Sequence, residues 1–283
     1  MIWVTGGNGM LGSELVEYFK HAGISCVSTD SEVDITDMYH VRNFVKQYNF
    51  THIINCAAYT HVDKAESDIT SAYSLNVLGP ENLAITAKEE EAVLIHYSTD
   101  YVFNGDSSEC YSESSLPGPL NVYGSTKYLG EIAIQRKCSD AYIIRTAWLY
   151  GKNGSNFVKT ILNVARTSND IYVVDDQFGS PTHTLSLIKF TKHLLDKSDY
   201  GTYHFTNRGS TSWYEFAKAI QEFAKKYDKW PMYAEILPTK TVDGDRPAKR
   251  PVRSLLSKKK IKDVFNYQTT PWTEELEEYI KEF

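Results

Sequence analysis

The chain has 283 residues, of which 42% are hydrophobic and 23% are charged, as is typical of a folded globular protein with one large domain and a smaller lobe. Its formal net charge of −6 argues against a nucleic-acid partner, because a protein that binds the phosphate backbone needs a basic surface. We therefore expect a small-molecule ligand.

The first half of the chain alternates short β-branched runs with helical patterns. This alternation predicts βαβ units, and so an α/β fold with a doubly wound parallel sheet of the Rossmann type. Leu11, Leu15, Val16 and Phe19 recur at the spacing of one helix face. The predicted strands are residues 2–5, 26–29, 52–56, 93–98 and 142–145.

A glycine-rich loop from Gly6 to Gly12 follows the first predicted strand and opens the first predicted helix. From Gly7 it reads G-x-G-x-x-G, a pattern in which glycines allow a tight turn and let the backbone approach a pyrophosphate at the helix N-terminus. A glycine-rich turn without a ligand is the alternative, but the strand and helix on either side favour a dinucleotide site.

Acidic residues follow the second predicted strand. Asp30 lies close to the ~20-residue offset at which a carboxylate meets the adenosine ribose of a dinucleotide. A turn or helix-cap role is the alternative for this residue. Asp34 and Ile35 come next, where an acid can accept a hydrogen bond from adenine and an aliphatic side chain can cover its ring.

Hydroxyl side chains end the fourth predicted strand, in the run Ser98-Thr99-Asp100. The carboxyl edge of a parallel sheet is where ligands of such folds bind, so Thr99 is a candidate hydrogen-bond donor to a substrate carbonyl. Ser98 and Thr99 can also be read as caps of the next turn.

Tyr123 and Lys127 are four residues apart, so on a helix they share one face. A lysine ammonium near a phenol lowers the phenol pKa, which suits the tyrosine to general acid catalysis. Tyr214 and Lys218 repeat this spacing in a later predicted helix, so the pattern alone carries little weight. The hydroxyls near Thr99 favour Tyr123 as the catalytic residue.

Beyond about residue 150 the pattern loosens. It predicts a helix over 156–167, a strand over 171–174, extended backbone at the Arg-Pro pairs of segment 238–251 and a last helix from residue 273. Ser212 and Glu215 form a capping box at the start of another helix. We expect a dinucleotide-binding domain over 1–150 and, over 151–283, mainly a substrate-binding lobe that can be interleaved with the sheet.

The cysteine spacing and the N-terminal sequence indicate where in the cell the protein is located. Cys26, Cys56, Cys110 and Cys138 show neither C-x-x-C pairing nor metal-ligand spacing, which predicts reduced core thiols and no metal site. The chain opens on a strand without a signal-peptide pattern, and no run approaches the ~18 apolar residues of a membrane span. A cytoplasmic protein is expected.

These motifs together resemble the extended short-chain dehydrogenases/reductases and, within them, the dTDP-4-dehydrorhamnose reductases. The resemblance covers nearly the whole chain and is most specific near residues 62–66 and 176–182. The matching stretches are residues 55–60, 62–66, 96–103, 120–124, 145–150, 156–160, 176–182 and 246–251.

The resemblance implies that NADH or NADPH reduces the C4 ketone of dTDP-6-deoxy-L-lyxo-4-hexulose to give dTDP-L-rhamnose, with Tyr123, Lys127 and Thr99 as catalytic residues. The residues it implies for the cofactor are Gly6, Gly9, Met10, Leu11, Asp30, Asp34, Ile35, Ala58, Tyr59, Thr60, Tyr123 and Lys127. Those it implies for the substrate are Val62, Asp63, Thr99, Asp100, Tyr123 and Trp148. Without the resemblance, Trp148 reads as a core aromatic residue.

Two alternatives stay open at this point. A nucleotide-sugar epimerase or dehydratase of the same superfamily needs further acid or base groups near Thr99, where only Asp100 follows. A cofactor-binding regulatory subunit would keep the fold without turnover. Some members dimerise around a metal held by glutamates; only Glu14 has a counterpart here, because 182–187 contains no acid, so a homodimer would not depend on that metal.

Overall fold

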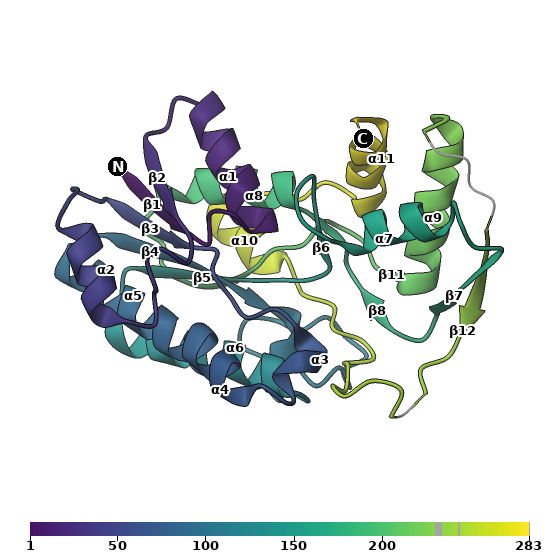
Figure 1. Ribbon diagram of the computed structural model, residues 1–283, viewed down its shortest axis with the longest axis horizontal. Helices are drawn as coiled ribbons and strands as arrows, with labels where there is room; N and C mark the ends of the chain where they lie inside the picture. Colours follow the sequence, from purple (N-terminus) through teal and green to yellow (C-terminus); the bar gives the residue numbers. More distant parts are fainter. Residues whose placement is uncertain (230–233, 243, 283) are drawn as a thin grey trace.

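A six-stranded parallel sheet forms the centre of the computed structural model, which describes residues 1–229, 234–242 and 244–282 (Figure 1). Its strand order is β10-β5-β4-β3-β1-β2, with the change of direction between β1 and β3. The strands are β1 (Ile2–Thr5), β2 (Cys26–Thr29), β3 (His52–Asn55), β4 (Val93–Thr99), β5 (Ala141–Thr146) and β10 (Gly201–His204). The Rossmann-type parallel sheet is thus confirmed, and β10 is a strand that the sequence analysis missed.

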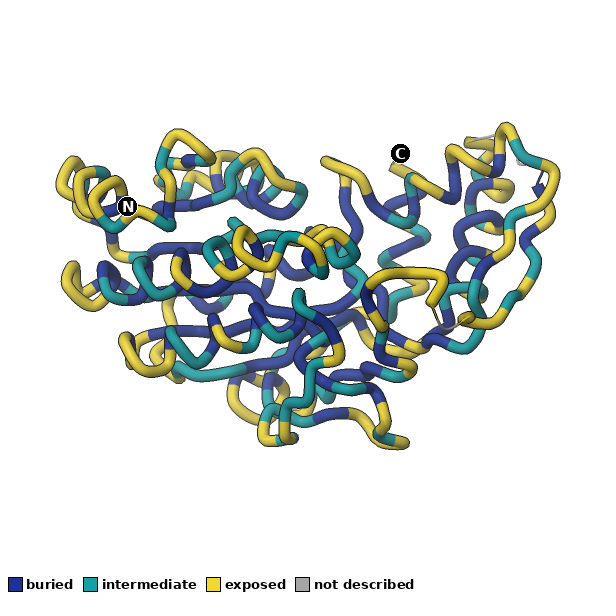
Figure 2. Tube along the Cα trace, turned by 60° about the horizontal axis from the view of Figure 1, so that its bottom comes forward, coloured by how far each residue is buried: buried dark blue, intermediate teal, exposed yellow. Residues whose placement is uncertain are grey.

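Helices cover both faces of this sheet, because successive side chains of each strand point to opposite faces. Along β1, Ile2 and Val4 belong to a core cluster with residues of α1 (Met10–His21), α8 (Thr184–Leu194) and α10 (Lys259–Phe265). Trp3 belongs to the opposite cluster, with α2 (Met38–Val45), α5 (Gly79–Glu89) and α6 (Val122–Lys137). Figure 2 shows the buried strands between helices whose outer sides are exposed.

The connection from β3 to α5 packs against α6, which covers one face of the sheet. It contains α3 (Val62–Ala65), α4 (Ile69–Tyr73) and the π-helical turn η1 (Ser74–Leu78). The buried Asn76 of η1 accepts from the Tyr59 backbone N–H at 2.9 Å and donates to the Thr126 hydroxyl at 3.1 Å. A Cβ atom on Gly130 would lie 2.1 Å from the Asn76 carbonyl oxygen, so α6 packs closely here because residue 130 is glycine.

The second half of the chain contributes to two parts of the molecule. Elements α8, β10 and α10 join the sheet, whereas α7 (Phe157–Val164), α9 (Trp213–Lys226) and α11 (Trp272–Glu282) share a separate core cluster. Ser212 caps α9 by accepting from the Glu215 backbone N–H at 3.1 Å, as predicted. The short strand pairs are β6 (Leu149–Tyr150) with β9 (Thr182–His183), β7 (Asp170–Val174) with β12 (Glu235–Thr239), and β8 (Phe178–Gly179) with β11 (Thr211–Ser212).

Several local predictions need correction. The helix predicted over 156–167 ends at Val164, because residues 165–167 turn out of it. Residues 244–248 form a turn and a bend instead of running extended. The four cysteines are free, but Cys110 is exposed rather than in the core, because its loop lies on the surface.

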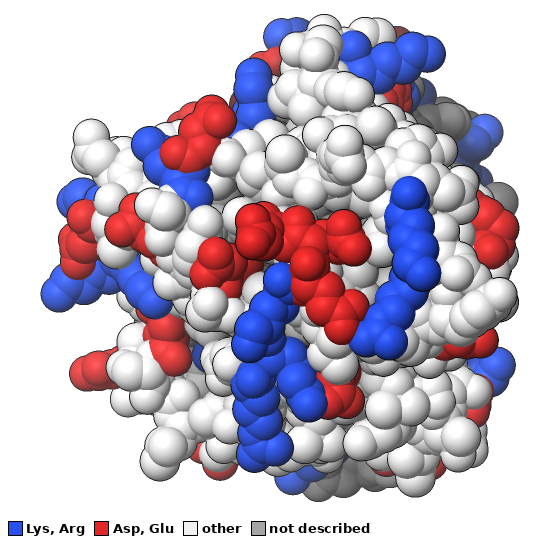
Figure 3. All heavy atoms as spheres, turned by 90° about the vertical axis from the view of Figure 1, so that its left-hand side faces the viewer, with Lys and Arg blue, Asp and Glu red and all other residues white. Residues whose placement is uncertain are grey.

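The surface carries charges of both signs. Figure 3 shows acidic and basic side chains beside one another on the face at the left of Figure 1. Arg42 pairs with Glu89 at 2.6 Å and Lys137 with Glu81 at 3.4 Å, and such exposed pairs contribute little to stability. Within the described part of the chain, every helix is too short or too polar to cross a bilayer.

Candidate active site

The glycine loop has the geometry that the sequence predicted. Gly6 has φ +66°, and a Cβ atom there would lie 2.6 Å from the Ala57 backbone nitrogen. A Cβ on Gly12 would lie 2.1 Å from the Gly6 carbonyl oxygen, so this glycine is needed for α1 to start beside β1. Gly9 differs, since a Cβ there would meet only the Gly6 oxygen at 3.3 Å. Gly9 therefore forms the open side of the loop.

Gly9 is also the N-cap residue of α1, and no side chain caps this helix end. The first-turn N–H groups, including those of Met10 and Leu11, therefore face outward with the positive end of the helix dipole. The Leu11 side chain is buried in the core, so this residue offers only its backbone. An anion fits this helix terminus.

A cleft of about 390 Å³ opens beside this loop, at the change of strand order between β1 and β3. Six residues predicted for the cofactor line it: Gly6, Gly9, Asp30, Asp34, Ile35 and Ala58. The lining residues that the prediction missed are Ser31, Val33, Cys56, Ala57 and Leu75. Their place in the sequence could have predicted them, because most of them directly follow β2 or β3.

Asp30 ties the end of β2 to the glycine loop. Its carboxylate accepts from the Asn8 and Ser31 backbone N–H groups, each at 3.0 Å. Each carboxylate oxygen retains capacity for a further hydrogen bond toward the cleft. The Asp34 carboxylate accepts from Thr36, and the cleft lining contains no lysine or arginine among the described residues.

The other six residues predicted for the cofactor lie outside this lining: Met10, Leu11, Tyr59, Thr60, Tyr123 and Lys127. The Tyr59 hydroxyl donates to Asp68 at 3.1 Å, which turns the phenol toward α4. Thr60 is exposed just beyond it.

Tyr123 sits in the first turn of α6, and three contacts set where this helix begins. Asn121 caps it by accepting from the Gly124 backbone N–H at 2.8 Å. Glu66 of the loop after α3 accepts from the Val122 N–H at 2.8 Å. A Cβ on Gly124 would lie 2.2 Å from the Tyr101 carbonyl oxygen, so glycine lets the helix start against the end of β4.

The Tyr123 phenol meets the end of β4. It lies near Thr99 and edge-on to Tyr101, with ring centroids 5.8 Å apart. Burial raises the pKa of Tyr123 to about 12, and the nearby Thr99 hydroxyl opposes this rise. Loss of solvation therefore dominates the pKa of Tyr123 in this structure, and the lowering by Lys127 that the sequence predicts stays a prediction.

Lys127 lies one helical turn further along α6 and is 2% exposed. Its Nζ donates to the Tyr97 carbonyl oxygen at 2.7 Å and lies 3.3 Å from His96 Nε2. Burial lowers the pKa of Lys127 to about 8, although the Glu131 carboxylate raises it. The ammonium is therefore held at the floor of the site by β4.

Asp100 follows Thr99 in the 3₁₀ turn η2 (Asp100–Val102) and is 2% exposed. Thr99 donates to its Oδ1 at 3.2 Å, and the Ser254 hydroxyl donates to its Oδ2. Burial raises the pKa of Asp100 to about 6, and both hydrogen bonds oppose this. The structure therefore brings Thr99, Asp100 and Tyr123 together and adds Ser254, which the sequence analysis did not consider.

Asp63 is paired within the protein. Arg250 donates to both of its carboxylate oxygens at 2.7 Å, and the Ala248 backbone N–H donates at 3.2 Å. These contacts, led by the bond to Arg250, lower the pKa of Asp63. Arg250 also lies close to the Tyr101 phenol, so Asp63 is connected to the site through Arg250. The neighbouring Val62 starts α3 and is half-buried.

Trp148 stands just past β5, whose last residue, Thr146, is paired with Thr99 across the sheet. Its φ of +49° lies in the left-handed region, where residues other than glycine are strained and often functional. Its ring stacks on Trp213 with centroids 3.6 Å apart, and a Cβ on Gly179 would lie 2.3 Å from its Cε2. As a whole residue Trp148 is half-buried.

The second Tyr–Lys pair and Glu14 lie outside the lining of the cleft. Tyr214 and Lys218 are on α9, where Tyr214 packs in the cluster of α7, α9 and α11. Glu14 accepts from Thr184 at 2.5 Å and from the Asn153 backbone N–H at 3.1 Å. Among the described residues, no group of three or more acidic, histidine or cysteine side chains is placed to bind a metal.

The parallel sheet, the glycine loop and the grouping of Thr99, Tyr123 and Lys127 at one sheet edge define a Rossmann-type protein of the reductase and epimerase class. The family model described as RmlD substrate binding domain matches residues 1–283. The chain belongs to this family.

Curated relatives and a solved structure agree over the full length. Spore coat polysaccharide biosynthesis protein SpsK of Bacillus subtilis (strain 168) is 38% identical, with 99% of this chain and 97% of SpsK covered. The dTDP-4-dehydrorhamnose reductase of Aggregatibacter actinomycetemcomitans is 38% identical, with 95% and 94% covered. The crystal structure of dTDP-4-dehydrorhamnose reductase from Bacillus anthracis str. Ames in complex with NADP has a TM-score of 0.95 at 38% identity, with 100% and 99% covered.

Proposed function

We propose that this chain is a dTDP-4-dehydrorhamnose reductase, which uses NADH or NADPH to reduce the C4 ketone of dTDP-6-deoxy-L-lyxo-4-hexulose to dTDP-L-rhamnose. The observation that carries the proposal is the grouping of Thr99, Tyr123 and the buried Lys127 at the carboxyl end of β4, together with a cleft at the change of strand order lined by Gly6, Gly9 and Asp30. The relatives bearing that name, one of them in complex with NADP, support the same reaction.

The cofactor is proposed to lie along the cleft, where the described residues suit it chemically. The N-terminus of α1 beside Gly9 would hold the pyrophosphate. Asp30 would accept from the ribose hydroxyls, and Asp34 and Ile35 would contact the adenine. The loop residues Ala58, Tyr59 and Thr60 would flank the cofactor beyond the pyrophosphate.

Tyr123 is proposed as the general acid. Bound NADH or NADPH supplies a hydride to the carbonyl carbon of the sugar. With a pKa raised to about 12, the phenol is protonated at neutral pH and can give its proton to the carbonyl oxygen. Thr99 would orient that oxygen, and Lys127 would hold the nicotinamide ribose and stabilise the phenolate by its charge.

The substrate is proposed to enter from the side of the second half of the chain. Asp100 would contact the sugar directly, and Trp148 would offer its ring. Asp63 would act through Arg250 and Tyr101, which form the wall beside Tyr123, with Val62 next to it. This arrangement supports a dinucleotide-binding part over 1–150 and a mainly substrate-binding part over 151–283.

A cytoplasmic location and a homodimer that does not depend on a metal are part of the same proposal. Size-exclusion chromatography with light scattering, with and without a chelator, tests the dimer.

The deciding experiment for the reaction is oxidation of NADH and NADPH by the purified chain with a panel of dTDP-4-keto sugars. Turnover with dTDP-6-deoxy-L-lyxo-4-hexulose and formation of dTDP-L-rhamnose are expected. Cofactor binding without turnover of any sugar would instead identify a regulatory subunit. Conversion of a sugar without net cofactor oxidation would identify an epimerase.

A further inference from the structure

A row of buried polar side chains crosses the sheet from β1 to β4 and ends at Lys127. It runs from Thr5 of β1 through Asn55 of β3 and His96 of β4, which occupy paired positions of adjacent strands. The Thr5 hydroxyl donates to Asn55 Oδ1 at 2.7 Å, Asn55 Nδ2 lies 3.0 Å from His96 Nδ1, and His96 Nε2 lies 3.3 Å from Lys127 Nζ. All four residues are at most 2% exposed, so each polar atom needs a partner.

The hydrogen-bond partners of Asn55 determine the tautomer of His96. The Ala57 backbone N–H, which can only donate, lies 3.1 Å from Asn55 Oδ1, so the amide oxygen must be on that side. The amide nitrogen then faces His96 Nδ1, which must accept. A neutral imidazole carries one hydrogen, and it is therefore on Nε2. Burial lowers the pKa of His96 well below its usual value, so the ring stays neutral.

The Nε2–H group points toward Lys127. An ammonium has three donors and no acceptor, so a donor facing it at 3.3 Å is unfavourable. The neutral amine has a lone pair that accepts from Nε2–H while one of its hydrogens goes to the Tyr97 carbonyl at 2.7 Å. Thus the arrangement of Asn55 and His96 stabilises the uncharged form of Lys127.

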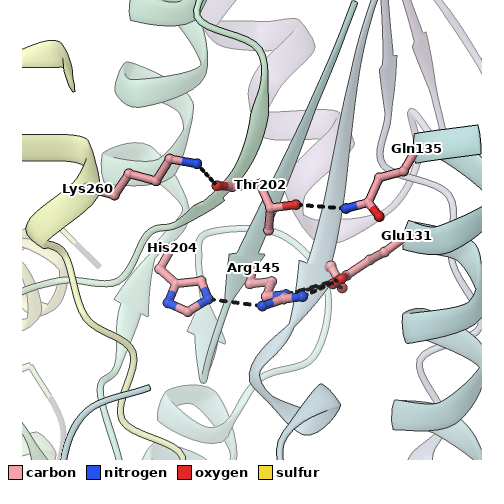
Figure 4. Close-up of polar contacts among 7 residues, drawn as sticks. Glu131, Gln135, Arg145, Thr202, His204 and Lys260 are labelled. Atoms are coloured by element: carbon pink, nitrogen blue, oxygen red, sulfur yellow. Dashed lines mark hydrogen bonds and ion pairs between the residues drawn. The ribbon is translucent and has the colours of Figure 1, made fainter. Parts of the chain in front are cut away.

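The charged and titratable groups around Lys127 do not cancel the stabilisation of its neutral amine. On its own helix, Glu131 favours the ammonium. The Glu131 carboxylate itself accepts hydrogen bonds from Arg145 Nη2 at 2.6 Å and from the Ser98 hydroxyl at 2.5 Å. Figure 4 shows the Arg145 guanidinium between Glu131 and His204.

The remaining neighbours are uncharged near neutral pH. Burial raises the pKa of the Cys56 thiol and of the Tyr97 phenol, and Tyr123 keeps its proton for the same reason. Burial also lowers the pKa of His204 well below its usual value. The net result is a Lys127 pKa lowered to about 8.

We propose that Asn55 and His96 are positioning residues of the reductase, which fix one imidazole tautomer and thereby favour the neutral amine of Lys127 over its ammonium. Their role rests on the proposed function of Tyr123 and Lys127. Because the ammonium is the form that stabilises the Tyr123 phenolate, the two residues set the upper pH limit of the reaction. Free enzyme loses activity as pH rises through the Lys127 pKa.

The first test reads the imidazole directly and requires no turnover. Long-range ¹H–¹⁵N NMR spectra of the full chain labelled with ¹⁵N-histidine distinguish the two tautomers, and the His96 signal is assigned by its loss in His96→Gln. We expect a protonated Nε2 and an unprotonated Nδ1 between about pH 6 and 9. An Nδ1–H tautomer or an imidazolium in this range would overturn the proposal.

The second test follows the pH profile of kcat/KM for NADH, which reports the free enzyme. In Asn55→Asp, a carboxylate of the same shape accepts from Nδ1–H, so Nε2 becomes an acceptor for the ammonium. The alkaline midpoint, expected near the Lys127 pKa of about 8, should rise by about one pH unit. His96→Gln, whose carbonyl oxygen can face the ammonium, should move it in the same direction.

The control is His52→Gln, at the opposite end of β3 from Asn55. It should leave the midpoint unchanged. Unchanged midpoints in both Asn55→Asp and His96→Gln would refute the proposal. The proposed function is tested separately, because full turnover by Tyr123→Phe would contradict it. The NMR measurement of the His96 tautomer does not depend on that outcome.

Discussion

Replacing Asp100 with asparagine is expected to stabilise the protein at neutral pH, although it removes a residue of the proposed site. In the folded state burial raises the pKa of Asp100 from 3.8 to about 6. The folded protein therefore binds a proton at this carboxyl more tightly than the unfolded chain does. This contribution is fully present below about pH 4 and is lost as pH rises through about 6.

The magnitude follows from the shift of about two pKa units, which corresponds to about 3 kcal/mol at pH 7. The asparagine side chain of the variant would be neutral at every pH, and its amide oxygen can still accept from Ser254 or Thr99. The difference in unfolding free energy between Asp100→Asn and wild type should thus grow by about 3 kcal/mol from pH 4 to pH 7.

Urea unfolding followed by tryptophan fluorescence measures this difference across the pH range. Asp263→Asn, which removes an exposed carboxylate on α10, is the matched control for the loss of one carboxylate. Parallel pH curves for Asp100→Asn and wild type would refute the assignment of a raised pKa. If Asp100 also accepts from the substrate, kcat/KM for the sugar should fall about ten-fold, as for one lost charge-assisted hydrogen bond.

Three further predictions address the proposed site. Tyr123→Phe should lower kcat by about 10²–10⁴-fold with little change in cofactor affinity, whereas Tyr214→Phe should leave the chemical step unchanged; near-normal turnover by the first would exclude Tyr123 as the acid. NADH should be used well because Asp30 offers a carboxylate and the cleft lining, among the residues that the structure describes, contains no lysine or arginine; a strict NADPH requirement in kcat/KM would contradict this. Trp148→Ala should lower kcat/KM for the dTDP-sugar about ten-fold or more while the Kd of NADH changes less than about three-fold. Because Trp148 stacks on Trp213, Trp148→Ala should also lower Tm, and Trp213→Ala is the control for this loss of stability. If both variants weaken the binding of the dTDP-sugar and of NADH to the same extent, Trp148 is a core residue.

Local signals predicted the early elements well. The strands β1 and β2 begin and end at the predicted residues, because their β-branched runs are short and bounded by the glycine loop and by polar turns. The glycine loop was predictable for a related reason: Gly6 and Gly12 are required by contacts within one strand–turn–helix unit. Strand β10 was not predictable in this way, since its place at the sheet edge depends on pairing with β5, some sixty residues earlier.

The chemical types of the site residues could therefore be predicted from the sequence, but the groups that surround them in the fold could not. Asp63 meets Arg250, Asp100 meets Ser254, and Lys127 meets His96 only after the chain has folded. Protonation depends on those surroundings, because burial and the direction of each hydrogen bond decide which charge state is favoured. The sequence by itself determined which groups can carry protons, and the tertiary structure decided which of them hold a proton at neutral pH.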